Sequence, residues 1–190
     1  MDIILIRHGE SEDNISKIFS RDATKLSSEG IKQIKATRKI LEGLDYKQVY
    51  YSPLTRTKDT LYYLGLQGIE EPRIREVNFG IFTGKTFAEC SAEFPKEVQM
   101  WIDHTNSYEI PKGESLETVC KRVVEFLEEV VKQNENVVLI THEGIIRIAC
   151  AWVMDDINYF FKFKAENGSI SVISIEDGYK YISKLNQTYI

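Results

Sequence analysis

Two short apolar segments of the sequence each lead into a histidine. Residues 3–6 are followed by Arg7 and His8, and residues 137–140 are followed, one residue later, by His142. Apolar runs of this length without polar alternation are typical of buried strands in a parallel sheet. Because ligands of open α/β sheets bind outside the carboxyl ends of the strands, we expect both imidazoles at that rim. The arginine beside the first imidazole indicates a site that handles phosphate.

Strand-like and helical patterns alternate along the chain. We expect strands at residues 3–6, 49–52, 137–140, 169–175 and 180–185. We expect helices from Ser28 until Gly43 ends the first, over residues 55–64, from residue 115, and over residues 144–154. This alternation predicts an α/β fold, a three-layer α/β/α arrangement around a mostly parallel sheet.

The C-terminal part of the chain departs from this alternation. Asp177 and Gly178 separate the last two strand-like segments, and such a dipeptide is a strong hairpin signal. The last strand should therefore pair antiparallel and lie at an edge of the sheet. An exposed edge of this kind can support pairing of two copies, so a homodimer is possible.

The length of 190 residues suits one domain over residues 1–190. Residues 71–112 hold three of the four prolines and have little strand character. We expect this segment to be an excursion above the strand ends, where walls of a substrate pocket are usually built.

Composition narrows the range of partners. With a net charge of -5 the chain has no electrostatic footprint for nucleic acid, and no apolar stretch approaches the ~20 residues of a membrane helix. The 3 cysteines are far apart and form no Cys-x-x-Cys pair, so neither disulfides nor a zinc site is expected. The first residues resemble a strand and not a signal peptide, which favours a cytoplasmic location.

The segment that begins at Arg7 carries the most specific chemistry. His8 can act as a nucleophile toward phosphorus, provided that its other ring nitrogen donates a proton to an acceptor. Gly9 would leave room for phosphate, and Ser11 and Asn14 fall where donors face an anion. The alternative is a structural histidine bonded to the backbone, with the glycine serving only the turn.

Two further strand ends supply candidate phosphate ligands. Arg56 follows the second strand near a helix N-terminus, where a cation is unfavourable unless an anion neutralises it. His142 can stabilise charge on a transferring phosphoryl group, and the helix beginning near Gly144 would add its amides. The alternatives are a solvated surface arginine and a structural histidine.

At this point the sequence resembles the histidine phosphatase superfamily, also called the phosphoglycerate-mutase-like family. In pattern it is closest to the small bacterial phosphatases, such as those acting on α-ribazole phosphate. The motifs that carry the resemblance span most of the chain: Arg7-His8-Gly9-Glu10-Ser11 with Asn14, Leu26-Ser27 with Gly30 and Gln33, Ser52-Pro53-Leu54 with Arg56 and Thr60, Glu76-Val77-Asn78-Phe79-Gly80 with Gly84, Gly113-Glu114-Ser115, and Thr141-His142 with Gly144 and Arg147.

The resemblance implies a phosphohistidine mechanism that needs neither metal nor cofactor. His8 would be the nucleophile, and Arg7, Arg56 and His142 would form a charged cradle that Asn14 assists. Only the resemblance singles out Glu76, as the proton donor to the leaving alcohol and then the base that activates water. The substrate would be a small phosphorylated metabolite.

Several positions depart from the family pattern and bear on substrate preference. These are residues 20–22, Lys25, Thr83 and Glu143, and Glu143 could lower the affinity of a highly anionic substrate. The leading interpretation is a phosphomonoester hydrolase. A phosphoglycerate mutase-type phosphotransferase is the alternative, although mutases of the family are longer. A module that binds phosphorylated ligands without turnover is a second alternative.

Overall fold

The apolar run at the start of the chain forms β1 (Asp2–Arg7), an inner strand of the sheet in the computed structural model, which describes residues 1–188. Because side chains alternate between the two faces of a strand, Ile3 and Leu5 enter one core and Ile4 and Ile6 the other. Both faces are covered, and this explains why the run shows no alternation. Residues 189–190 of the predicted domain lie outside the described residues.

Six strands form one mixed sheet in the order β3-β2-β4-β1-β5-β6. The other five strands are β2 (Gln48–Tyr51), β3 (Ile69–Glu70), β4 (Val137–Thr141), β5 (Ile170–Glu176) and β6 (Tyr179–Gln187). β1, β2, β3 and β4 are parallel, whereas β5 runs antiparallel to β1 and to β6. The predicted mostly parallel sheet with an antiparallel pairing at its edge is confirmed, and the reversed strand is β5.

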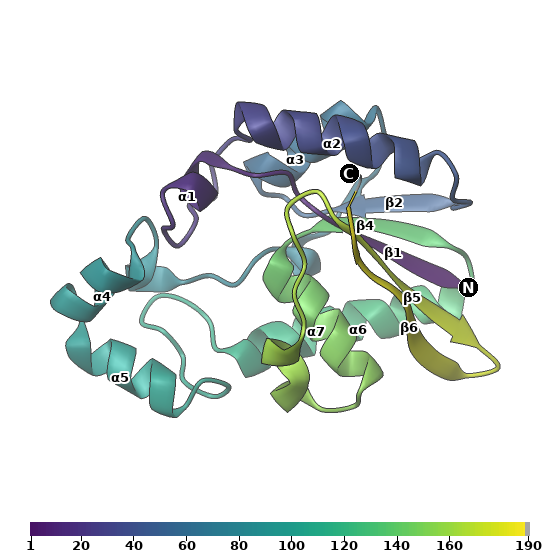
Figure 1. Cartoon of the computed structure of the whole chain (residues 1–190). Helices are drawn as coiled ribbons and strands as arrows, with labels where there is room; N and C mark the ends of the chain where they lie inside the picture. Colours follow the sequence, from purple (N-terminus) through teal and green to yellow (C-terminus); the bar gives the residue numbers. More distant parts are fainter. Residues whose placement is uncertain (189–190) are drawn as a thin grey trace.

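Helices cover both faces of this sheet (Figure 1). Helices α2 (Ser28–Leu41) and α3 (Thr55–Leu64) pack on the face that Ile4 and Ile6 enter. Helices α6 (Leu116–Gln133) and α7 (Glu143–Val153) pack on the opposite face, together with the 3-10 helix η3 (Ile157–Lys162). The predicted three-layer α/β/α arrangement is therefore confirmed.

Residues at the helix ends explain where α2 and α3 begin and stop. Ser27 caps α2, because its hydroxyl accepts a hydrogen bond from the Gly30 amide at 3.0 Å. The expected stop at Gly43 is displaced, since α2 ends at Leu41 and Glu42 is its C-cap. Helix α3 ends at Gly65, whose φ of 72° is the left-handed conformation that glycine allows.

The predicted hairpin joins β5 to β6. Asp177 and Gly178 have φ angles of 48° and 83°, so both turn residues are left-handed, as a two-residue hairpin of this kind requires. The edge strand β6 exposes Tyr179, Tyr181 and Leu185. Pairing of two copies through this edge stays a prediction.

The segment over residues 71–112 has helices of its own. It contains the 3-10 helices η1 (Pro72–Ile74) and η2 (Gly80–Phe82) and the helices α4 (Phe87–Glu93) and α5 (Pro95–Asp103). Helices α4 and α5 lie to one side of the sheet, near the short helix α1 (Glu12–Ile15) (Figure 1). A separate apolar cluster fills this part of the molecule, formed by Phe82, Cys90, Val98 and Ile110.

In the described part of the chain, no helix has the length and apolar character that crossing a membrane requires.

The turn after β1 is held against the start of α2 by two glycines. A Cβ atom added to Gly30 would lie 2.0 Å from the carbonyl oxygen of Glu10, and one added to Gly9 would lie 2.5 Å from the carbonyl oxygen of Gly30. The two backbones therefore approach more closely than any side chain permits. This gives Gly9 a packing reason, while its predicted role beside phosphate stays a prediction.

We expect Gly30→Ala to destabilise the fold by about 1–3 kcal/mol, the scale of an overpacked site, because the backbone of Glu10 must move away. Gly43→Ala is the matched control, since its Cβ would meet only a carbonyl oxygen at 3.6 Å. That control should change the free energy of unfolding by less than about 1 kcal/mol. Urea denaturation of both variants measures the difference, and equal losses would contradict the close approach.

Candidate active site

The parallel register of β1 and β4 brings the two histidines together. Arg7 lies opposite Thr141 in the register, so His8 and His142 leave the sheet at the same level. Their ring centroids are 5.2 Å apart, and both side chains are buried. The expectation that the two strand ends meet at one rim is therefore met by the geometry.

The hydrogen bonds of His8 define its tautomer. Nδ1 lies 2.7 Å from the carbonyl oxygen of Gly9, which can only accept, so Nδ1 carries the proton. Nε2 then keeps its lone pair and accepts from Nε of Arg56 at 3.3 Å. Burial, together with the charges of Arg56 and Arg7, holds the pKa of His8 well below its usual value of 6.5. His8 is thus neutral near pH 7, with the unprotonated Nε2 that a nucleophile needs.

Arg56 is an almost fully buried cation, with 1% of its surface exposed. It lies in the first turn of α3, directly after β2, and its Nη1 donates to the carbonyl oxygen of Arg21 at 3.0 Å. Within residues 1–188 it forms no ion pair with a carboxylate, and burial lowers its pKa although the charges of Glu76, Asp22 and Asp13 oppose that effect. Because a buried charge is costly without an opposite charge, this side chain favours binding of an anion.

His142 faces the same place from β4. Its Nε2 lies 2.7 Å from the hydroxyl of Ser52, and its Nδ1 is buried without a hydrogen-bond partner in the described part of the chain. Burial and the charge of Arg56 hold its pKa well below 6.5. Ser52 had no predicted role, although it directly follows β2 and so obeys the same strand-end rule as the histidines.

Arg7 is tied to the start of α7. Its Nη1 lies 2.9 Å from a carboxylate oxygen of Glu143 and also donates to the carbonyl of Ala165, whereas its Nε is buried without a partner. The second oxygen of Glu143 pairs with Arg147. Burial lowers the pKa of Arg7, and the charge of Glu143 opposes that effect. The carboxylate of Glu143, a departure from the family pattern, therefore joins two arginines.

Glu76 comes from the irregular segment between η1 and η2. Its Oε1 accepts a hydrogen bond from the Val77 amide at 3.0 Å. The carboxyl group lies against Gly144, where an added Cβ atom would be 2.5 Å from Oε1. Gly144, the second residue after His142, thus makes room for the Glu76 carboxyl group.

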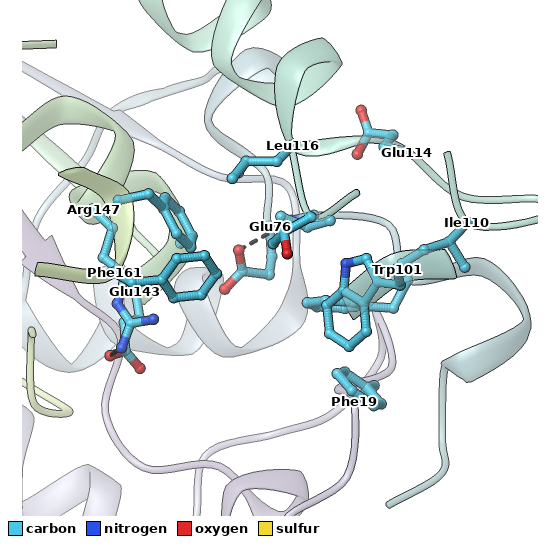
Figure 2. A pocket seen from close by; sticks show the side chains of 14 residues that line it. Phe19, Glu76, Trp101, Ile110, Glu114, Leu116, Glu143, Arg147 and Phe161 are labelled. Atoms are coloured by element: carbon cyan, nitrogen blue, oxygen red, sulfur yellow. Dashed lines mark hydrogen bonds and ion pairs between the residues drawn. The ribbon is translucent and has the colours of Figure 1, made fainter. Parts of the chain in front are cut away.

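A cavity of about 240 Å³ adjoins Glu76 (Figure 2). Figure 2 shows Phe161 on one side of Glu76 and Trp101 and Phe19 on the other, with Arg147 and Glu143 close together. Arg147 is the one cationic side chain among the lining residues that the structure describes. The walls combine residues of the 71–112 segment with residues near η3. His8 is buried, with 3% of its surface exposed, and is not among the lining residues.

Ser11 and Asn14 lie in the turn after His8 and bond to each other. Ser11 caps α1, and the side-chain oxygen of Asn14 accepts from the Ser11 amide at 3.0 Å. Asn167, which sequence reasoning missed, donates to the carbonyl oxygen of His8 and to the side chain of Asn14, each at 3.2 Å. The Ser11 hydroxyl is thus engaged in the helix cap, and Asn167 links the side chain of Asn14 to the backbone of His8.

The remaining departures from the family pattern lie at different distances from the site. The segment over residues 20–22 contacts it through the carbonyl oxygen of Arg21, which accepts from Arg56. Lys25 and Thr83 are exposed, and neither lines the cavity.

Within residues 1–188, no group of three or more His, Cys, Asp or Glu side chains converges as a metal site would require.

Comparison with known proteins agrees with this geometry. The model of the histidine phosphatase superfamily (branch 1) matches residues 3–188. The chain belongs to the histidine phosphatase superfamily. This histidine phosphatase is 35% identical to phosphoserine phosphatase 1 of Hydrogenobacter thermophilus, over 98% of the chain and 92% of that relative.

Two other relatives extend the comparison. The chain is 30% identical to a fructose-2,6-bisphosphatase of Saccharomyces cerevisiae over 80% of its length, but it spans only 34% of that protein. Among solved structures, a putative α-ribazole-5'-P phosphatase from Escherichia coli superposes with a TM-score of 0.92 at 24% identity, covering 98% of this chain and 96% of that one. The shared fold is thus the same along nearly the whole chain.

The two buried neutral histidines should make stability depend on pH. Their pKa values are lowered in the fold, so below pH 6.5 the unfolded chain binds protons that the folded chain does not. Stability should therefore fall as the pH drops below 6.5, approaching about 1.4 kcal/mol per pH unit for each histidine.

Urea unfolding between pH 7 and pH 5 measures this dependence. The double variant His8→Gln/His142→Gln should show a shallower loss than the wild type. His104→Gln, at an exposed histidine, should keep the wild-type slope. Identical slopes in wild type and double variant would show that the two imidazoles are not buried as neutral groups.

Proposed function

We propose that this histidine phosphatase hydrolyses small phosphomonoesters through a covalent phosphohistidine on Nε2 of His8, without a metal ion. The observation that carries the proposal is the buried Arg56 guanidinium, whose Nε points at the lone pair of His8. A phosphoryl group at this place would receive positive charge from Arg56 and Arg7. Nδ1 of His142 and Nε of Arg7 have no other partner in the described structure, which supports their use as phosphate contacts.

In the first step, the lone pair of His8 Nε2 attacks phosphorus and the bond between phosphorus and the ester oxygen breaks. The leaving oxygen takes a proton from the carboxylic acid of Glu76. The Nδ1 proton stays on the ring, where the Gly9 carbonyl stabilises the positive charge that forms. Arg7, Arg56 and His142 stabilise the charge on the phosphoryl oxygens.

In the second step, the Glu76 carboxylate takes a proton from water while the water oxygen attacks phosphorus. The bond between phosphorus and Nε2 then breaks, which restores neutral His8 and releases inorganic phosphate. The same two residues therefore serve both steps, and the Glu76 carboxyl group returns to its acidic form.

The cavity beside Glu76 supports a substrate with one phosphate and an apolar alcohol portion. Aromatic side chains supply much of its wall. Three carboxylates also line it, and the arginines beside two of them are already paired, Arg7 and Arg147 with Glu143 and Arg122 with Glu114. A second anionic group would meet these carboxylates, so bisphosphates and phosphorylated acids should bind less well than neutral apolar esters.

Rapid quenching during turnover with labelled p-nitrophenyl phosphate tests the covalent route. In excess chelator we expect an acid-labile, base-stable adduct on His8 and continued hydrolysis. His8→Ala should lose the adduct and at least ~10³-fold in kcat, because the covalent path is removed. His104→Ala is the matched control and should keep both the adduct on His8 and the wild-type kcat. Loss of turnover on chelation, or turnover without an adduct, would contradict the proposal.

Two alkyl phosphates of similar leaving ability test the substrate preference. We expect kcat/KM for 2-phenylethyl phosphate to exceed that for 3-phosphoglycerate by at least about 10-fold, equivalent to ~1.4 kcal/mol. Trp101→Ala should reduce this ratio, because Trp101 lines the apolar wall. A higher kcat/KM for 3-phosphoglycerate would contradict the proposal that the cavity prefers an apolar alcohol portion.

A further inference from the structure

The segment that carries Glu76 lacks regular hydrogen bonding of its own. It follows η1 and precedes η2, so neither a helix nor a strand fixes the backbone of residues 75–79. A carboxyl group on such a segment keeps its place only if other residues hold the backbone. Two charged residues outside the segment, Arg122 and Glu114, provide these contacts.

Arg122 lies on α6, and its guanidinium reaches the backbone before Glu76. Its Nη1 donates to the carbonyl oxygens of Arg73 and Arg75, the latter at 3.0 Å, and its Nη2 is 3.5 Å from the carbonyl oxygen of Glu76. Its Nε and Nη2 each donate to one carboxylate oxygen of Glu114 at 3.1 Å. One planar side chain therefore joins three carbonyl groups and a carboxylate.

Glu114 holds the backbone on the other side of Glu76. Its Oε2 accepts from the Asn78 amide, and its own amide donates to the carbonyl oxygen of Asn78, both at 2.9 Å. Burial raises the pKa of Glu114, but the hydrogen bonds from Arg122 and from the Asn78 amide lower it more, so the net pKa is below the usual range. Glu114 therefore remains a carboxylate that can pair with Arg122.

The Glu76 carboxyl group has two contacts that fix its place at the edge of the cavity. It lies between the Val77 amide, which donates to it, and Gly144, which leaves space for it because it has no Cβ atom. A displacement of the backbone by about 1 Å would move the carboxyl group out of reach of the leaving oxygen, and such errors can cost ~10²-fold in rate.

We propose that Arg122 and Glu114 are positioning residues, which act as a clamp on residues 73–78 and so aim the Glu76 carboxyl group at the leaving oxygen. The proposal rests on the function proposed above, in which Glu76 protonates that oxygen. Neither residue needs to touch phosphate. Arg122 has 17% of its side chain exposed and Glu114 20%, so the pair is largely shielded from water and from salt.

The clamp predicts a particular pattern of lost activity. An alkyl alcohol leaves only with a proton, whereas p-nitrophenol leaves readily as an anion. A misplaced Glu76 should therefore reduce kcat/KM for 2-phenylethyl phosphate far more than kcat/KM for p-nitrophenyl phosphate. A general loss of folded protein would reduce both values equally.

Arg122→Lys keeps the charge but cannot reach the carbonyl groups and both carboxylate oxygens at once. We expect it to lower kcat/KM for 2-phenylethyl phosphate about 10–100-fold, and for p-nitrophenyl phosphate less than about threefold. Glu76→Gln should show the same selective loss and serves as the reference. Arg38→Lys, in an exposed pair with Glu42 on α2, is the control and should change neither value.

If Arg122→Lys fails to fold, as thermal unfolding will show, Glu114→Gln provides the same test. Its amide can still accept from Asn78, but its pairing with Arg122 is weakened. Equal losses on both substrates would overturn the clamp. If Glu76→Gln is selective and the clamp variants are not, the clamp fails while the proposed function stands. If Glu76→Gln itself is not selective, the proposed function fails at its proton donor.

Discussion

The parallel pairing of β1 with β4 is the constraint on which the site depends. The two strands are neighbours inside the sheet, and each is buried on both faces. A shift of the register by one residue would turn every side chain to the opposite face and carry His142 away from His8. The apolar residues of the two strands therefore do more than fill the core. They fix the level at which two imidazoles leave the sheet.

The chemistry of the site depends on how burial treats cations and imidazoles differently. The guanidinium groups of Arg7 and Arg56 stay charged when buried because their ordinary pKa is so high. The imidazoles of His8 and His142 give up their charge under the same conditions. The result is a neutral imidazole with an unprotonated nitrogen beside permanent positive charge. A chain with a net charge of -5 can attract phosphate only through such a local concentration of arginines.

Much of this arrangement could be predicted from sequence, because strand ends follow a simple rule. His8, His142 and Arg56 each follow a strand, and apolar runs reveal buried strands well. Glu76 could not be found in this way, since it comes from an irregular segment, and only the family resemblance singled it out. Asn167 was missed for a different reason. It precedes β5, and only the reversed direction of that strand brings its start to the rim where the other strands end.

Polar contacts between residues far apart in the chain could not be predicted from the sequence either. Arg122 occupies a polar position of an amphipathic helix, where most arginines face solvent, and nothing local indicates that it reaches three carbonyl groups 46 to 49 residues away. The short strand β3 has only two residues, too few to show any periodicity. Helices α4 and α5 lie in a segment whose prolines concealed their pattern, although Pro95 begins α5 at a position that suits proline.

The small apolar cluster of Phe82, Cys90, Val98 and Ile110 has a consequence for how proteins of this design can diversify. Phe19, Phe79 and Trp101, which line the cavity, pack against this cluster, so one wall of the cavity rests on an apolar core separate from the two cores of the sheet. Replacements there can reshape the cavity while the strands that present the imidazoles remain undisturbed. Under the proposed function, the part of the chain that recognises the substrate and the part that reacts with it can therefore change separately.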